Sequence, residues 1–129
     1  MDANIKERLV DAAIGGRAHA YARYSHFEVG AAVLTASGQI FIGCNVENAS
    51  YGLTICAERA AVCAAVSAGH KKLVAVAVAT AGGHAPCGAC RQVLSEFGPA
   101  MEILLVDADD PSQVRTTSLD KLLPEQFVL

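Results

Sequence analysis

Residues 73 to 80 have the sequence LVAVAVAT, an apolar run in which valine and alanine alternate. β-Branched residues at every second position favour a strand, and the lack of a polar face indicates an interior strand that is covered on both sides. A strand of this kind requires a layer of helices on each face of its sheet. The run therefore predicts an α/β fold, and the neighbouring segments provide its other elements.

Two apolar helices are expected, one before and one after this strand. The first runs from Cys56 to about Ala68, is apolar on all faces and ends at Gly69, a residue suited to terminate a helix. We expect this helix to be buried almost all round. The second runs from Cys87 to Phe97, follows a loop that contains two glycines, and is stopped by Gly98-Pro99.

The remaining elements extend the fold in both directions along the chain. Helical spacing of apolar residues predicts a first helix from about Asn4 to Tyr24. The other expected elements are a hairpin of strands Val29 to Ala36 and Gln39 to Cys44 around Ser37-Gly38, strands Glu102 to Val106 and Val114 to Thr117, a turn at Asp110-Pro111-Ser112, and a short helix from Ser118. Together they predict a three-layer α-β-α sandwich with a mixed sheet of about five strands, formed by a single domain over residues 1–129.

Composition and charge narrow the class of partner. The chain has 13 acidic and 10 basic residues, and Lys71-Lys72 is the only adjacent basic pair, as expected of a solvated loop. Because no basic surface for phosphates is visible, we expect a small-molecule partner and no nucleic acid. Charges interrupt the N-terminal segment, and the apolar run Leu73 to Ala79 is too short to span a bilayer. We therefore expect no membrane association and a cytoplasmic location.

The five cysteines are the main chemical clue, because thiols in a reducing compartment are metal ligands or catalysts rather than disulfides. The segment Pro86-Cys87-Gly88-Ala89-Cys90 places two thiols three residues apart at a helix start, where both can hold one metal ion. A redox pair activated by the helix N-terminus and a chance pair of buried cysteines are the alternatives.

The segment Cys56-Ala57-Glu58 favours the metal, because it opens the other apolar helix and two helix N-termini can then meet around one zinc ion. Three thiolates, from Cys56, Cys87 and Cys90, without an obvious fourth protein ligand leave one coordination position open. An open position distinguishes a catalytic from a structural zinc site. Glu58 is then the candidate base that deprotonates a zinc-bound water, although an acidic residue also stabilises a helix N-terminus.

The excess negative charge of such a site must be offset by positive charge nearby. Three thiolates overneutralise a divalent ion and work against its ability to acidify water. The positive ends of both helices and the guanidinium of Arg59 are placed to compensate for this excess of negative charge.

These motifs resemble those of a known family. C-A-E followed by P-C-G-A-C is similar to the zinc deaminase pattern. A wider resemblance, to cytidine deaminase in its small homotetrameric form, is carried by Tyr24-Ser25-His26-Phe27, by GCNVENASYG at residues 43–52 and by PCGACRQ at residues 86–92. This similarity covers nearly the whole chain.

The resemblance implies zinc-dependent hydrolytic deamination of cytidine, and of 2′-deoxycytidine, to uridine or deoxyuridine and ammonia, as in pyrimidine salvage. It implies one Zn²⁺ per subunit, with zinc hydroxide attacking C4 of the pyrimidine. Glu58 would take the proton of the water, protonate N3 and then protonate the leaving amine, while the backbone amide of Ala57 helps to hold the base. A homotetramer with pockets shared between subunits is also implied, and it would bury the alanine-rich helix.

The resemblance implies further substrate-binding residues. Asn45 and Glu47 would bind the 3′-hydroxyl of the ribose, although both residues also suit a turn. Phe27 would pack on the base, unless it only anchors its loop in the core. Tyr51 and Phe127 resemble residues that complete the pocket of a neighbouring subunit, and docking of Phe127 on its own domain is the alternative.

Two departures from the family pattern concern the loop that carries Phe27. Arg23 and Glu28 stand where prolines are expected, which puts the rigidity of this loop in doubt. Outside the motifs, we expect buried small residues at Cys44 and Cys63, and loop or surface residues at His26, His70 and His84.

Two other functions stay open at the level of the residues. One is another small-molecule deaminase of the same fold, such as one acting on blasticidin, and the other is a noncatalytic zinc or thiol redox protein. A structural zinc site would have a fourth protein ligand, and a redox protein would be indifferent to Glu58.

Overall fold

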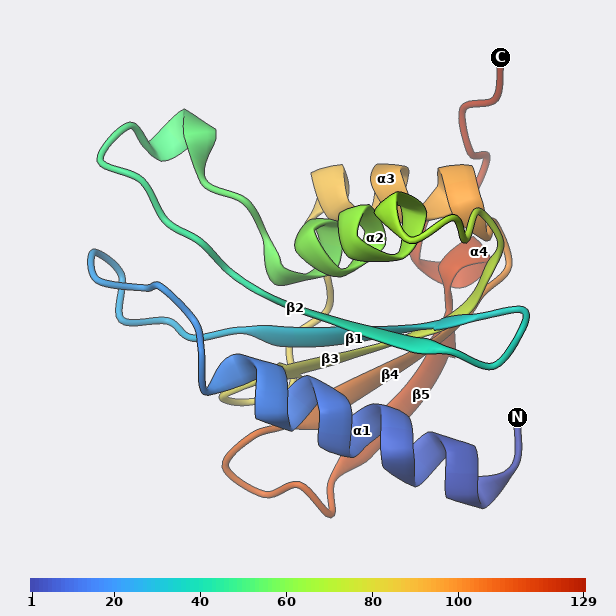
Figure 1. The fold of residues 1–129 in the computed structure, drawn as a ribbon, viewed down its shortest axis with the longest axis horizontal. Coiled ribbons are helices and arrows are strands. Elements are labelled where there is room, and N and C mark those ends of the chain that lie inside the picture. The colour runs from blue at the N-terminus through green and yellow to red at the C-terminus, as the bar shows by residue number, and fades with distance from the viewer.

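The computed structural model describes residues 1–129 and contains one sheet of five strands in the order β2-β1-β3-β4-β5 (Figure 1). Strands β3 and β4 are parallel, and every other neighbouring pair is antiparallel. The strands are β1 (Gly30–Thr35), β2 (Ile40–Cys44), β3 (Leu73–Thr80), β4 (Glu102–Asp107) and β5 (Val114–Ser118). The predicted mixed sheet of about five strands is confirmed, and the alternating Val/Ala run lies at its centre.

Helices cover both faces of the sheet. Figure 1 shows α1 (Ala3–Arg17) on one face, and α2 (Ala57–Ser67), α3 (Gly88–Phe97) and the short α4 (Leu119–Leu122) on the other. A single 3₁₀ turn, η1 (Tyr51–Leu53), interrupts the long connection from β2 to α2. This arrangement confirms the three-layer α-β-α sandwich, in which η1 is the one element that the sequence patterns missed.

The alternation in β3 separates two packing layers, because successive side chains of a strand point to opposite faces. Val76 and Val78 join the core beneath α2 and α3, whereas Ala75, Ala77 and Ala79 face α1. The small alanines let α1 approach the sheet closely, and burial of each valine on the other face stabilises the fold by about 1.5 kcal/mol. The pattern therefore determines which helix layer can pack tightly.

The first helix is shorter than its sequence pattern predicted, ending at Arg17 and not at Tyr24. Beyond Arg17 the backbone turns back and pairs with the segment after β2. Tyr21 N–H donates to Asn45 O across 2.9 Å, and Glu47 N–H donates to Tyr21 O across 2.9 Å. These hydrogen bonds replace those that a longer helix would make, so tertiary pairing overrides the helical spacing.

Helix α2 is not buried almost all round, as its composition predicted. Ala57, Ala61 and Ala65 pack into the core, but Cys63 on the opposite side is exposed. The helix lies on one face of the sheet near its β2 edge, where no further layer covers it. The expectation that Cys63 is buried is therefore wrong within a single chain, and Cys44 is half-buried, with its thiol donating to His19 O.

None of the helices combines the length and the apolar character that crossing a bilayer requires.

Candidate metal centre and active site

Three cysteine sulfurs meet where α2 and α3 begin, all within 4.8 Å of one another. Cys56 and Cys87 are the residues immediately before the two helices, and Cys90 lies in the first turn of α3. Neither Cys56 nor Cys87 uses its side chain to cap its helix, so both thiols remain available to a ligand. The predicted convergence of the two helix N-termini is confirmed.

The donor set fits zinc. At a Zn–S distance of about 2.3 Å, the sulfurs of a tetrahedral site are about 3.8 Å apart, so the observed cluster needs only small adjustments. Soft thiolates select Zn²⁺ over hard cations such as Mg²⁺ or Ca²⁺. No histidine, carboxylate or fourth cysteine joins the group. Cys56, Cys87 and Cys90 can therefore hold a zinc ion with one coordination position left open.

Arg59 lies beside this cluster, where its positive charge can offset the negative charge of the thiolates, as the sequence predicted. Its Nη2 lies 3.6 Å from Cys56 Sγ and donates to Thr54 O across 3.2 Å, while its buried Nε has no hydrogen-bond partner. The pKa of Cys56 is lowered to about 5, first because the Cys90 thiol donates to it and then because Arg59 is close. The same hydrogen bond raises the pKa of Cys90. One thiolate is thus stabilised before any metal binds.

Glu58 is the buried carboxyl group of the site, with 5% of its surface exposed. Its pKa is raised above the ordinary value, first by burial away from water and then by the negative charge of Cys56. A carboxyl group with a raised pKa can accept and release a proton near neutral pH. The position of Glu58 in the first turn of α2 therefore serves proton transfer better than helix stabilisation alone.

A cavity of about 240 Å³ opens beside the cysteines. The predicted residues that it brings together are Phe27, Asn45, Cys56, Ala57, Glu58 and Cys87. Val29, Thr54, Val78, Thr80, His84 and Ala85 complete its lining. The cavity therefore joins two of the three metal ligands, a buried acid and an aromatic side chain in one largely apolar space, which is typical of a small-molecule site.

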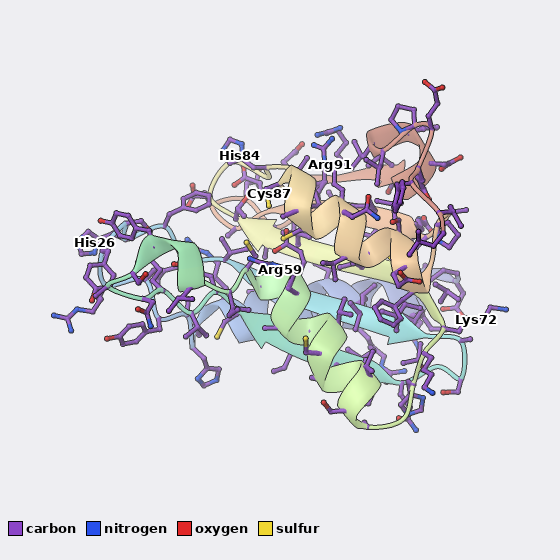
Figure 2. The ribbon with its side chains drawn as sticks, turned by 90° about the horizontal axis from the view of Figure 1, so that it is seen from above. His26, Arg59, Lys72, His84, Cys87 and Arg91 are labelled. Atoms are coloured by element: carbon purple, nitrogen blue, oxygen red, sulfur yellow. The ribbon has the colours of Figure 1, made fainter.

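His84 is an exposed loop residue, as expected, but it also lines the cavity, which the sequence patterns did not predict. Its ring centroid lies 6.1 Å from that of Phe27, with the planes tilted by 55°. Figure 2 shows His84, Cys87 and Arg59 gathered at the same end of the sheet. Its sequence position, shortly before Pro86-Cys87, is the only signal that pointed to the site.

Five predicted residues do not line this cavity. Cys90 and Arg59 lie at the cysteine cluster beside it, and the other three are Glu47, Tyr51 and Phe127. Glu47 accepts hydrogen bonds from the backbone of the loop at Tyr24 and Ser25. Tyr51 is 74% exposed and packs edge-on against Tyr24, and Phe127 is 70% exposed near the C-terminus. Their roles in substrate binding stay predictions, although the exposure of Phe127 does not fit docking on its own domain.

Comparison with known proteins agrees with this geometry. A family model described as the cytidine and deoxycytidylate deaminase zinc-binding region matches residues 3–106. A probable cytidine deaminase of Dictyostelium discoideum is 48% identical over 124 residues, which are 94% of this chain and 82% of that protein. A cytidine deaminase of Mycobacterium tuberculosis is 51% identical over 114 residues, which are 87% of this chain and 81% of that protein.

A solved structure gives the same answer at the level of the fold. The crystal structure of cytidine deaminase from Burkholderia pseudomallei matches with a TM-score of 0.89 and 48% identity, covering 98% of this chain and 100% of that one. The family match, the relatives and the cluster of three cysteines with a buried glutamate agree. The chain therefore belongs to the cytidine and deoxycytidylate deaminases, a family of zinc-dependent hydrolases.

Proposed function

We propose that this chain hydrolyses the 4-amino group of cytidine, and of 2′-deoxycytidine, to give uridine or deoxyuridine and ammonia. The observation that carries the proposal is the meeting of three cysteine sulfurs beside one small cavity, whose wall contains two of these cysteines and the buried Glu58. Relatives that are 48% and 51% identical bear the names probable cytidine deaminase and cytidine deaminase, which supports the same substrate here. A purely structural zinc site would have a fourth protein ligand, and none joins the group.

Cys56, Cys87 and Cys90 would hold one zinc ion per subunit, and this ion would supply Lewis-acid activation of a water molecule. Glu58 takes one proton of this water, so that the oxygen can bond to C4 of the pyrimidine. Glu58 then passes this proton to N3 of the pyrimidine. The same carboxyl group transfers the second proton of the water to the amine, which leaves as ammonia. The raised pKa of Glu58, caused first by its burial, favours proton uptake by this carboxyl group more than an exposed glutamate would.

The other wall residues orient the nucleoside. We assign Phe27 to packing on the base and the backbone amide of Ala57 to holding it, since both line the cavity. Asn45 and Glu47 are assigned to the 3′-hydroxyl of the sugar, with Asn45 at the cavity wall and Glu47 two residues further along the chain. None of these roles needs a 2′-hydroxyl, so both ribo- and deoxyribonucleosides are expected substrates.

We further infer a homotetramer that acts in pyrimidine salvage in the cytoplasm. The exposed side of α2 around Cys63 and the exposed Tyr51 and Phe127 are the surfaces that a second subunit would cover. In that assembly Tyr51 and Phe127 would complete the pocket of a neighbouring subunit. Residues 1–129 would form one catalytic domain in each subunit.

Incubation of the purified protein with cytidine tests the activity directly. We expect the ultraviolet absorbance to shift to that of uridine, and we expect one zinc per subunit by elemental analysis. Glu58→Gln keeps the size of the side chain but removes its capacity to transfer a proton, so this variant should hold zinc and lose turnover. A fully active Glu58→Gln protein would contradict the mechanism, and inertness of the wild type toward cytidine would contradict the substrate.

A further inference from the structure

The loop that carries Phe27 lacks the covalent stiffness of proline. Arg23 and Glu28 precede and follow its central residues, and His26, at its outer end, has a left-handed backbone with φ of 60° (Figure 2). A non-glycine residue in this region is held there by its surroundings, because the conformation is intrinsically unfavourable. One local contact supports this conformation, since His26 N–H donates to Ala22 O across 2.8 Å, and further contacts come from other parts of the chain.

The first set of contacts comes from Glu47, whose carboxylate is turned toward the loop. Its Oε1 accepts hydrogen bonds from the backbone N–H groups of Tyr24 and Ser25, across 2.9 Å and 3.1 Å. Its Oε2 accepts a hydrogen bond from the hydroxyl of Ser25. The start of the loop is thereby attached to the segment that follows β2.

The hydroxyl of Ser25 connects Glu47 to the backbone of Phe27. While this hydroxyl donates to Glu47, the same oxygen accepts a hydrogen bond from Phe27 N–H across 3.0 Å. On the other side, Asn45 Nδ2 donates to Phe27 O across 2.8 Å, and Asn45 Oδ1 accepts from Val29 N–H across 3.0 Å. The backbone of Phe27 is therefore held at both its N–H and its carbonyl group.

From this chain of contacts we propose that Ser25 is a positioning residue, which links the carboxylate of Glu47 to the backbone of Phe27 and so sets the pose of the aromatic wall of the cavity. The inference rests on the proposed function, since it assigns Ser25 to the binding of the same nucleoside. It also explains how a loop without flanking prolines keeps its shape.

The brace leaves Glu47 free to bind substrate as well. An ionised carboxylate has about four lone-pair sites, and the three loop hydrogen bonds use three of them. The remaining site is on Oε2, so Glu47 can accept a sugar hydroxyl without releasing the loop. Binding of the sugar and placement of Phe27 are therefore coupled through one side chain.

Removal of the Ser25 hydroxyl should loosen the pose of Phe27 without unfolding the chain. Ser25 is exposed, so water can replace its lost partners, and Asn45 still holds the carbonyl of Phe27. Displacement of a substrate-contacting group by about 1 Å can reduce turnover by up to about 100-fold. We expect Ser25→Ala to lower kcat/KM for cytidine about tenfold, mainly through a higher KM, with zinc content unchanged.

The test compares Ser25→Ala with a conservative variant, a double-mutant cycle and one control. Ser25→Thr keeps the hydroxyl and should restore kcat/KM to within about threefold of the wild type. In a double-mutant cycle, the effect of Ser25→Ala should shrink to less than about twofold in the Phe27→Ala background, because the aromatic wall that it positions is gone. Ser112→Ala removes another exposed serine hydroxyl that donates to a carboxylate, that of Asp110, and should leave kcat/KM unchanged.

Amide hydrogen exchange supplies a readout that does not depend on turnover. Residues 24–28 should exchange faster in Ser25→Ala than in the wild type, whereas the strands of the sheet should not. Equal KM and equal exchange in Ser25→Ala and wild type would overturn the inference while cytidine turnover stands, as would a failure of Ser25→Thr to restore KM. A wild-type protein that does not turn over cytidine would overturn the proposed function, and the inference with it.

Discussion

The guanidinium of Arg59 lies 3.6 Å from the sulfur of Cys56, measured from Nη2, and its own Nε is buried without a partner. A buried cation with an unmet donor is costly unless negative charge is close by. The thiolate of Cys56 supplies that charge, and Arg59 offsets it in return. The charge balance of the metal centre therefore depends on Arg59, a residue that is not itself a ligand.

Removal of this charge should impair the metal centre. We expect Arg59→Gln to lower kcat or zinc affinity about 10- to 100-fold, the usual effect of losing a partner of a metal ligand. Steady-state kinetics and zinc titration against a chromogenic chelator measure the two quantities. Arg115→Gln, at an exposed position of β5, is the control and should change neither. Unchanged kinetics and zinc affinity in Arg59→Gln would remove Arg59 from the charge balance.

Arg91 should stabilise the loop that presents Cys87. Its Nε donates to Pro86 O and its Nη1 to Leu122 O, each across 2.8 Å, which ties the ligand loop to α4. Arg91→Lys keeps the charge but cannot span both carbonyls, so we expect a loss of about 2 kcal/mol in the free energy of unfolding. Zinc release to a chelator should be about tenfold faster. Arg8→Lys, on the exposed side of α1, provides the comparison, and release rates equal to those of that control would contradict the role of Arg91.

Gly43 should be intolerant of any side chain. A Cβ at this position of β2 would lie 2.5 Å from Ala57 O and 2.5 Å from Ala61 N, inside the backbone of α2. Gly43→Ala should lower the free energy of unfolding by about 1–3 kcal/mol through overpacking, and it should reduce turnover because α2 carries Glu58. Chemical denaturation measures the first effect. Gly52→Ala, where a Cβ meets nothing within 4 Å, should stay within about 0.5 kcal/mol of wild type.

Asp107 should make the free energy of unfolding decrease at acid pH. Its Oδ1 accepts from Gly82 N–H and Asp109 N–H, each across 3.0 Å, and the first of these bonds is the main reason why the pKa of Asp107 lies below its ordinary value of 3.8. A lowered pKa stabilises the fold above that ordinary value, and the contribution disappears as pH falls through the folded-state pKa. The stability advantage of wild type over Asp107→Asn should therefore be full near neutral pH and shrink below pH 3.8.

Denaturant unfolding at a series of pH values tests this dependence. Asp11→Asn, on the exposed side of α1, serves as the reference for an acidic residue outside the loop. A constant difference between wild type and Asp107→Asn at every pH would mean that the titration of Asp107 is not linked to folding.

Local patterns in the sequence were sufficient for most elements of the fold and for the metal ligands. The Val/Ala alternation of β3 identified a strand that is covered on both faces, because residue size and periodicity act within a few residues of one another. The C-x-x-C spacing and the cysteine before Glu58 identified the ligand set for the same reason, since each motif lies at one helix start. The strand prediction depended on local geometry alone, whereas the ligand set also required the two helix starts to converge, as they do in the structure.

Features that depend on contacts between distant segments were wrong or were missed. The end of α1 was misplaced because Tyr21 pairs with Asn45 and Glu47, and these hydrogen bonds leave no trace in the helical spacing. The open side of α2 was missed because a run of alanine and valine looks the same whether or not another layer covers it.

The sequence by itself determined the layers of the sandwich, the three zinc ligands and the candidate acid Glu58, because these follow from periodicity and from spacing at helix starts. Only the tertiary structure decided that His84 lies beside Phe27 at the cavity and that Glu47 braces the loop through Ser25. These contacts join residues from different segments of the chain. Such contacts form only when the fold brings distant segments together, so no local pattern of residues predicts them.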